Sequence, residues 1–314
     1  MTPPRTPATA QRGVALITAI LVVAIATIAA AAMAVSHQIA VHRSRTLQES
    51  EMGWWYIEGV EQWVMTILQR DAETSDYDSL VEPWAQPVDH LPVDEGVLRG
   101  RLVDLQGRFN LNNLASADAE ALTRYNGHFQ RLYVLVGAGT DFEAAAMASV
   151  IRDWIDPDQE PTGFDGAEET EYLGFSPPYR TPDRPMVDVG ELMAVKGMTR
   201  EIFELLRPHI TALPLVGSAV NVNTATEPVL LSLVQTPGPE LSGFLESRLD
   251  APLQDVAAIQ SSLTVDAPPV SVASQYFMLE SEALIGSSRV GLYHLIYRPT
   301  GAPPSVLARG AYPD

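Results

Sequence analysis

The strongest chemical signal in this sequence is a run of acidic residues from Asp153 to Glu171, called here the acidic loop. Eight carboxylates fall in this stretch and no basic residue lies between them. Carboxylates packed together repel one another, so each one favours protonation, separation or a bound cation. Calcium takes six to eight oxygen ligands in a forgiving geometry, which suits a long loop of carboxylates and carbonyl groups. The spacing does not match an EF-hand, which needs Asp-x-Asp-x-Asp-Gly and a glutamate at its twelfth position.

Two other interpretations of the acidic loop stay open at the level of sequence. A solvated loop needs no ligand, and a pair of its carboxylates could instead catalyse hydrolysis as in glycosidases. Other catalytic signatures are missing from the sequence, which has no cysteine, no His-Glu-x-x-His motif, no Gly-x-Ser-x-Gly elbow and no P-loop. We therefore expect that the chain is not an enzyme.

An uncharged segment near the N-terminus determines where the acidic loop can act. Residues 14–35 carry no charge, and some 22 residues at about 1.5 Å each span about 33 Å, the thickness of a bilayer core. Arg5 and Arg12 precede this segment, so the N-terminus should stay on the cytoplasmic side. A plain transmembrane anchor is one interpretation. A cleaved secretory signal, with Ala32-Met33-Ala34 as its small-x-small site, is another.

The same segment continues into a second, one-sided helical pattern. No proline occurs from Val14 to Glu82, and apolar residues recur at helical spacing after the uncharged segment: Tyr56, Val60, Trp63, Val64, Ile67 and Leu68. One helix can therefore run from about residue 14 to about residue 70, roughly 85 Å. Its first half suits lipid or the core of a fibre, and its second half should support a globular head.

The rest of the chain predicts a head of antiparallel strands that is interrupted by helices. A strand, a turn and a second strand are expected in residues 98–114, and later strands in residues 275–285, 290–297 and 305–312. Residues 71–92, rich in Asp, Glu and Pro, predict a surface connection.

Helical patterns lie between these strands. Residues 115–213 have helical periodicity. Residues 221–249 predict a further helix with Thr224 as its N-cap. The fold class is therefore α+β, with a long N-terminal helix, an antiparallel sheet and a large inserted helical domain.

The N-terminal pattern resembles a type IV prepilin, in which a short basic leader ending in glycine precedes a long uncharged helix. The leader peptidase of that family would cut after Gly13 and leave Val14 as the new N-terminus. Most pilins carry glutamate at the fifth mature position, where this sequence has Thr18. In lacking this glutamate, the sequence resembles one branch of the family, the minor pseudopilin K of type II secretion. The resemblance covers most of the chain, from Gly13 to about Tyr297, and implies a pilin-like fold.

The resemblance implies a division of the chain into five parts. They are a prepilin leader (1–13), a transmembrane and fibre-core helix (14–36), the helix continuation with the first strands (37–112), the inserted helical domain with the acidic loop (113–215), and the C-terminal part of the head (216–314).

Three segments resemble the calcium loop of the K pseudopilins: Asp-Trp-Ile-Asp-Pro-Asp at 153–158, Gly-Ala-Glu-Glu at 166–169, and Pro-Pro-Tyr-Arg-Thr-Pro-Asp at 177–183. Two calcium ions are implied by this resemblance. The expected ligands are Asp156, Asp158, Glu168, Glu169 and Asp183, and the further candidates are Asp153, Glu160 and Glu171.

The resemblance also implies a function. The chain would sit at the tip of the type II secretion pseudopilus and initiate fibre assembly for protein export across the outer membrane. Its expected partners are the minor pseudopilins I and J, other pseudopilins and the prepilin peptidase, which belongs to a family that also methylates the new N-terminus. Its expected location is the inner membrane, as a single-pass protein whose C-terminal domain lies in the periplasm.

Two alternatives to this function stay open. They are the tip pilin of a type IV pilus and a membrane-tethered periplasmic hydrolase that uses paired acids. Nucleic acid is not an expected partner. Residues 192–198 resemble a helix-hairpin-helix turn, but the formal net charge of −19 repels a phosphate backbone.

Overall fold

The computed structural model describes residues 12–260 and 267–311 of the chain. Most of the predicted leader, residues 1–11, therefore lies outside the described residues. Helix α1 (Arg12–Thr74) confirms the single long helix and is about 95 Å long at 1.5 Å per residue. Gly13 and Val14 lie in its first turn.

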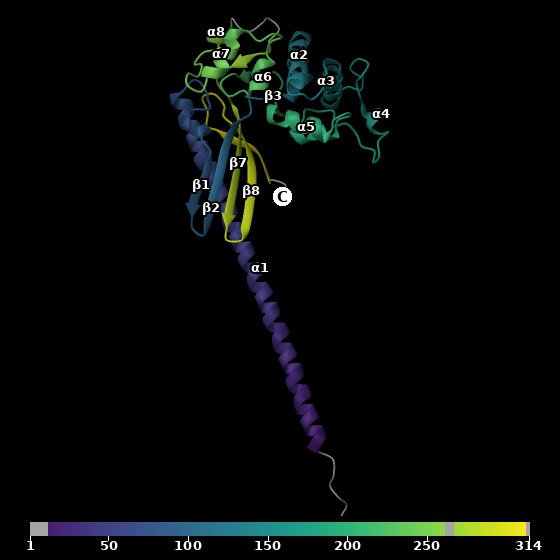
Figure 1. Ribbon diagram of the computed structural model, residues 1–314, viewed down its shortest axis with the longest axis vertical. Coiled ribbons are helices and arrows are strands. Elements are labelled where there is room, and N and C mark those ends of the chain that lie inside the picture. Colours follow the sequence, from purple (N-terminus) through teal and green to yellow (C-terminus); the bar gives the residue numbers. More distant parts are fainter. Residues whose placement is uncertain (1–11, 261–266, 312–314) are drawn as a thin grey trace, which may run out of the picture.

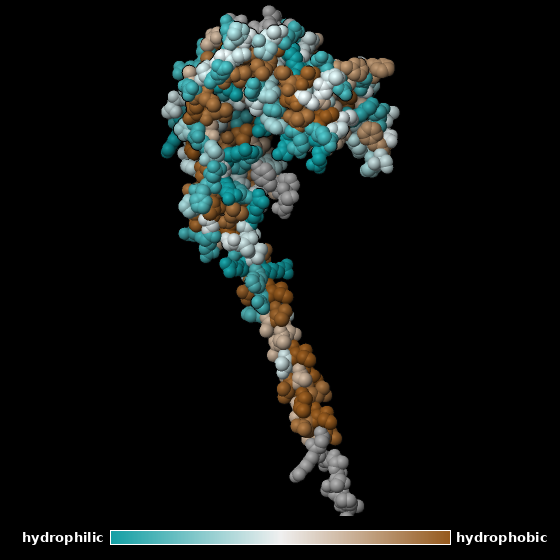
Figure 2. Space-filling model, in the orientation of Figure 1, coloured by the Kyte–Doolittle hydropathy of each residue, from teal (hydrophilic) through white to brown (hydrophobic). Residues whose placement is uncertain are grey.

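The first half of α1 stands alone below the rest of the molecule (Figure 1). All residues from 14 to 48 are exposed, and we call this part the rod. Figure 2 shows that most of the rod is apolar, whereas the surface of the head is mixed. By its length and composition, the helix Val14–Thr74 includes a stretch that is long and apolar enough to cross a membrane. A surface of this kind needs lipid or other helices to cover it.

The second half of α1 lies along a sheet of five antiparallel strands, and together they form the head (Figure 1). The strands follow the order β1-β2-β7-β8-β9, with the bounds β1 (Val88–Val93), β2 (Gly96–Asp104), β7 (Tyr276–Ile285), β8 (Ser288–Tyr297) and β9 (Ser305–Ala311). Burial alternates along β7 and β8, as expected where one face of a sheet is covered. The three C-terminal strands predicted from the sequence are confirmed.

Two apolar clusters join α1 to the sheet. Ile57 packs against β8 near its start, and Val64 and Leu68 pack against Phe277 and Leu279 of β7. The face of α1 that packs on the sheet is therefore slightly rotated about the helix axis from the face that the sequence predicts. Trp63, which was expected on the packed face, has 49% of its surface exposed, and Ile57 is buried instead.

The inserted domain lies beside the sheet and beyond the end of α1 (Figure 1). Its helices are α2 (Ala119–Leu135), α3 (Asp141–Ile155), α4 (Glu169–Tyr172), α5 (Arg200–Leu206), α6 (Glu227–Leu231), α7 (Pro239–Ser247) and α8 (Ala257–Gln260). Short 3₁₀ helices η1 (Pro83–Ala85), η2 (Leu111–Ala115), η3 (Val189–Ala194) and η4 (Arg207–His209) connect parts of the chain. Two parallel strand pairs, β3 (Phe109–Asn110) with β4 (Ile210–Thr211) and β5 (Val220–Asn221) with β6 (Val270–Ser271), complete the fold.

One buried core runs through the inserted domain from Phe109 to Ile259. This core therefore includes residues on both sides of residue 215, the predicted end of the inserted domain. The reason is that α6 and α7 pack their apolar residues, such as Val229 and Leu241, into the same cluster as α2 and α3. The N-termini of α2 and α3 are capped locally. Asp118 accepts two backbone N–H groups, and Thr140 forms a capping box with Glu143.

The predicted second strand of residues 98–114 is present but much shorter than expected. Beyond β2 the chain forms only the two residues of β3 and then the 3₁₀ helix η2. The cause is side-chain hydrogen bonding by asparagine. The Asn110 side chain accepts from the Asn112 backbone N–H at 3.2 Å, and the Asn112 amide donates to the carbonyl oxygens of Met186 and Leu213. These bonds compete with a β ladder.

The predicted helix in residues 221–249 is also wrong in its extent. It is divided into α6 and α7, because Pro237-Gly238-Pro239 interrupts it. Thr224 is not an N-cap. Its hydroxyl bonds to Asp104, and Thr226 occupies the N-cap position of α6, where its hydroxyl makes no capping bond and lies 2.7 Å from His209 Nδ1. Residues 71–92 are only partly a connection, because they contain the end of α1, η1 and β1.

Asp104 is the polar centre of the junction between the sheet and the inserted domain. Its Oδ2 accepts hydrogen bonds from the Thr224 hydroxyl at 2.5 Å, the Ser274 hydroxyl at 2.6 Å and the Asn221 amide at 3.0 Å. Burial raises the pKa of Asp104 to about 6, because these bonds compensate desolvation only in part.

This raised pKa predicts a pH-dependent free energy of unfolding. The folded chain keeps the Asp104 proton up to about pH 6, whereas the unfolded chain releases it near pH 4. The stabilising contribution is therefore complete below about pH 4 and is lost as the pH rises through 6. A shift of about two pKa units corresponds to about 3 kcal/mol. Asp104→Asn should remove pH dependence of up to this size between pH 4.5 and 7.5, measured by urea unfolding. The same pH dependence in the variant as in the wild type would contradict this assignment.

Candidate metal centre

The acidic loop begins at the C-terminal end of α3. Trp154 and Ile155 are buried there, and Asp156 ends the helix by donating its backbone N–H to the Arg152 carbonyl oxygen at 2.9 Å. Aromatic rings hold the base of the loop. The Trp154 ring lies edge-on to Tyr172 with the ring centres 5.2 Å apart, and the Tyr179 hydroxyl donates to the Ala194 carbonyl oxygen at 2.7 Å. The loop is thus attached to the core on both sides.

Three carboxylates converge in this loop. One oxygen from each of Asp156, Asp158 and Glu168 lies within 4.8 Å of the other two. Two oxygens that bind the same calcium ion, each about 2.4 Å from it, are at most about 4.8 Å apart. The three side chains are therefore close enough to share one ion.

Several carboxylate oxygens in and beside this cluster lack hydrogen-bond partners within the described part of the chain. Asp156 Oδ1, both Glu168 carboxylate oxygens and Asp183 Oδ1 are buried without a hydrogen bond. Buried polar atoms are almost always hydrogen-bonded in folded proteins, so these four oxygens, in and beside the acidic loop, have the character of cation ligands. Arg152 offers one positive charge, with its Nε 3.4 Å from Asp156 Oδ2.

The electrostatics lead to the same conclusion. Burial, together with the neighbouring acids Asp153, Asp156, Asp158 and Asp183, raises the pKa of Glu168 to about 7. Burial and the charges of Asp158 and Asp153 raise the pKa of Asp156 to about 6. Both shifts mean that the ionised forms are costly in the absence of a cation. The donor set, made of carboxylate oxygens only, fits calcium.

Asp183 lies beside the cluster, although it follows the acidic loop in the sequence. Its backbone has φ +49°, a left-handed conformation that is unusual for a residue other than glycine. The Gln159 side-chain amide donates to Asp183 Oδ2 at 3.0 Å, which ties Asp183 to the loop, and its Oδ1 stays unpartnered. Asp183 is therefore placed as a fourth possible ligand.

The structure does not bring all eight predicted residues together. Asp153 is completely buried, but it accepts the backbone N–H groups of Thr162 and Ala167, which fold the loop back on α3. Glu169 pairs with Arg180 at 3.5 Å, and Glu171 pairs with Lys196 at 2.9 Å. Glu160 is exposed. Asp156, Asp158 and Glu168 thus form the candidate centre, Asp183 lies beside it, and the other four surround it.

A second group of acids escaped the sequence analysis. Asp71, Asp78 and Glu82 also place one carboxylate oxygen each within 4.8 Å of the others. Here, however, a cation of the chain itself is present. Arg298 donates to Asp71 Oδ2 at 2.8 Å, to Asp78 Oδ1 at 2.6 Å and to the Ser274 carbonyl oxygen at 2.8 Å. We interpret this group as a buried ion-pair cluster that ties the end of α1 to the end of β8.

The chain was compared with known protein families and structures. Residues 107–215 match the family model described as "Type II secretion system (T2SS), protein K". Among curated proteins, the type II secretion system protein K of Pseudomonas aeruginosa is 31% identical over 95% of this chain and 92% of its own length. The protein K of Aeromonas hydrophila is 30% identical over 92% of this chain and 93% of its own length.

The structural comparison gives the same result. The fold matches a chain in the crystal structure of the GspK-GspI-GspJ complex from enterotoxigenic Escherichia coli, with a TM-score of 0.71 and 25% sequence identity. The match covers 87% of this chain and all of that chain. It thus includes the head as well as the inserted domain. On the strength of both the sequence and the fold, this chain belongs to the type II secretion system protein K family.

Proposed function

We propose that this chain is the minor pseudopilin at the tip of the type II secretion pseudopilus and that it initiates fibre assembly there. One observation carries the proposal: an exposed apolar rod, residues 14–48, leads into a head that the inserted domain extends to one side (Figure 1). The rod suits lipid before assembly and a bundle of sister helices afterwards. The extended head leaves little room for another head to stack above it.

The position of Thr18 supports a place at the tip. Its hydroxyl donates to the carbonyl oxygens of Val14 and Ala15, both at 3.0 Å, so its hydrogen bonds are made within its own helix. A carboxylate at this position could dock beneath the N-terminal amine of a preceding subunit, and a threonine has no charge for this contact. The role is structural, and no catalysis is proposed.

The partners follow from the family. The solved relative is a chain of a complex with GspI and GspJ, and we propose the minor pseudopilins I and J as the partners of this chain. Prepilin peptidase would remove residues 1–13 and methylate Val14. The chain would lie in the inner membrane with one span, and the head and the inserted domain would be in the periplasm.

The acidic loop is proposed to bind calcium. Asp156, Asp158 and Glu168, with Asp183 beside them, would hold one ion, and a second ion stays a prediction from the resemblance. Calcium would neutralise carboxylates that otherwise repel one another, and so it would stabilise a loop that is too charged to fold well alone.

Gene deletion in the bacterium that encodes this chain tests the proposed function. Loss of the chain should leave exported proteins in the periplasm, and the full chain supplied from a plasmid should restore their release. The restored chain should co-purify with I and J from detergent-solubilised membranes. Normal secretion after deletion would contradict the proposal, and loss of surface pili without a secretion defect would favour the type IV pilus alternative.

A further inference from the structure

Strand β9 is held to the head by few side-chain contacts. It forms one edge of the sheet and, among the described strands, pairs only with β8. No residue from Ser305 to Ala311 is buried, and Val306 packs only partly buried against the apolar core. Residues 298–304 connect β9 to β8, whereas the opposite edge strand, β1, is joined to β2 by residues 94–95 alone. An edge strand with so little buried surface and so long a connection needs little free energy to open.

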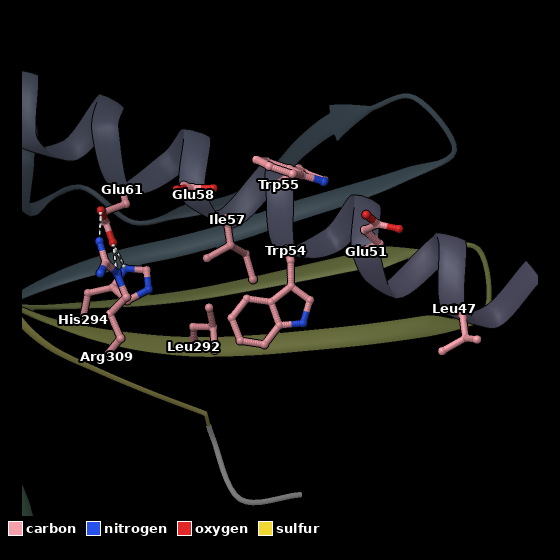
Figure 3. A pocket seen from close by; sticks show the side chains of 10 residues that line it. All are labelled: Leu47, Glu51, Trp54, Trp55, Ile57, Glu58, Glu61, Leu292, His294 and Arg309. Atoms are coloured by element: carbon pink, nitrogen blue, oxygen red, sulfur yellow. Dashed lines mark hydrogen bonds and ion pairs between the residues drawn. The ribbon is translucent and has the colours of Figure 1, made fainter.

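One buried ion pair gives β9 a side-chain anchor. Arg309 donates to both carboxylate oxygens of Glu61 on α1, each at 2.7 Å (Figure 3). Glu61 is 1% exposed, and the hydrogen bonds from Arg309 lower its pKa, so Glu61 is ionised while β9 is in place. Departure of β9 would leave this buried carboxylate without its cation, and an uncompensated buried charge is costly.

A second possible partner of Glu61 lies beside Arg309. His294 of β8 is directly opposite Arg309 in the strand register, and Figure 3 shows both side chains directed toward Glu61. His294 is buried, and neither of its ring nitrogens has a hydrogen bond within the described residues. Its Nδ1 lies 3.5 Å from Glu61 Oε2, too far for a good hydrogen bond. This imidazole is therefore close to Glu61 but is not bonded to it while Arg309 occupies the carboxylate.

The electrostatics keep His294 neutral while β9 is in place. Burial lowers the pKa of His294, the negative charge of Glu61 opposes this effect, and the positive charge of Arg309 adds to it. Departure of Arg309 would remove that positive charge, admit water and leave Glu61 as an unpaired anion. All three changes favour the protonated imidazole, which would give Glu61 a charge-assisted hydrogen bond in place of those from Arg309.

The other groups around His294 act in the same direction. On the side of β7 its partner in the register is Leu279, which carries no charge. On α1, Glu51 and Glu58 line the same groove as His294, and both are exposed acids. Their negative charges also favour a protonated His294, most of all once Arg309 has left.

We propose that β9 is a strap that acid releases: a protonated His294 replaces Arg309 as the partner of Glu61, and β9 leaves the sheet and uncovers the edge of β8. The open form binds the proton more tightly than the closed form, so a lower pH shifts the population toward the open form. All of these groups belong to the head. The strap therefore operates whether or not the chain caps a fibre.

The size of the effect follows from the ordinary titration of histidine. An imidazole with a pKa of about 6.5 is about 90% protonated at pH 5.5 and about 10% protonated at pH 7.5. If His294 has this ordinary pKa in the open form and stays neutral in the closed form, the ratio of open to closed chains rises about tenfold between pH 7.5 and pH 5.5.

Hydrogen–deuterium exchange of the full chain in detergent, followed by mass spectrometry, measures the opening of β9. The intrinsic exchange rate at each pH is divided by the observed rate of the peptide that covers residues 305–311, which gives a protection factor free of the chemical pH dependence. We expect this factor to fall about tenfold from pH 7.5 to pH 5.5. The protection factor of β1, the other edge strand and also without a buried residue, should change less than twofold.

Three variants complete the test. His294→Gln cannot take up the proton, so β9 should keep its pH 7.5 protection at both pH values. Arg309→Met removes the anchor, so protection should be at least tenfold lower at pH 7.5 and should fall no further at pH 5.5. Arg289→Met is the matched control, because it removes an exposed ion pair of the same sheet and should leave the response of β9 unchanged.

Three results would overturn the inference. They are an unchanged protection factor of β9 in the wild type, an equal fall in β1, and a full pH response in either His294→Gln or Arg309→Met. Circular dichroism checks that each variant is folded. Should His294→Gln fail to fold, Arg309→Met provides the same test, because Glu61 then faces His294 in the closed and the open form alike.

Discussion

Calcium should raise the midpoint temperature of thermal unfolding of the full chain by about 5–10 °C relative to the same chain in excess chelator. At a calcium concentration of 100 times Kd, binding contributes about 2.7 kcal/mol, and each kcal/mol shifts the midpoint of a domain of this size by about 2–4 °C. The effect arises because Asp156 Oδ1 and both carboxylate oxygens of Glu168 have no hydrogen-bond partner among the described residues. Differential scanning fluorimetry in detergent measures it directly.

Glu168→Gln should change the stability of the chain in opposite directions without and with calcium. In chelator, the neutral amide avoids the cost of a charge that is buried among other acids, so the variant should be at least as stable as the wild type. With calcium it should lose most of the gain, because an amide is a weaker ligand than a carboxylate. Glu160→Gln is the matched control, because Glu160 lies in the same loop but is exposed. Equal midpoints with and without calcium in the wild type would contradict the calcium assignment.

Arg298→Met should lower the free energy of unfolding by about 3–5 kcal/mol, since removal of one partner leaves buried charges uncompensated. Asp78 and Arg298 are 1% and 7% exposed, and the guanidinium also lies 4.8 Å from the centre of the Phe277 ring. The change would therefore loosen the joint between the end of α1, β7 and β8. Urea unfolding monitored by circular dichroism measures the loss.

Arg289→Met provides the control for this prediction. Arg289 pairs with Glu282 on the same sheet, but its side chain is 73% exposed, so its removal should cost less than about 1 kcal/mol. Adding Asp78→Asn to Arg298→Met should restore part of the stability, because it removes one of the stranded charges. A similar loss for both arginine variants, or no recovery in the double variant, would show that the cluster is not a net stabilising contact.

The long helix and the C-terminal strands could be predicted because their patterns are local. A proline-free apolar run and a period of two depend only on neighbouring residues. Residues that bond across the fold could not be predicted in this way. Thr224 has the spacing of an N-cap but bonds to Asp104, which is far away in the sequence. Asn110 and Asn112 fit a strand but bond backbone groups of Leu213 that the fold brings to them.

The sequence predicts that the candidate metal centre is built from acidic residues of one loop, but it does not predict which of these residues converge. The sequence places eight acids in one loop. It does not show that Asp153 folds back to accept backbone N–H groups, or that Arg180 and Lys196 neutralise Glu169 and Glu171. The cluster around Arg298 was missed for a related reason. Its acids come from a segment that predicts an exposed connection, and its cation comes from the end of a strand some 220 residues later.

The mass of the N-terminal peptide, measured on the chain purified from native membranes, tests most directly whether the rod persists in the mature protein. We expect a peptide that begins at Val14, with the whole of the rod retained, and we expect Gly13→Leu to keep residues 1–13 attached. A native chain that begins near Val35 would have lost the surface that both the membrane and the fibre require. That result would contradict the assembly role.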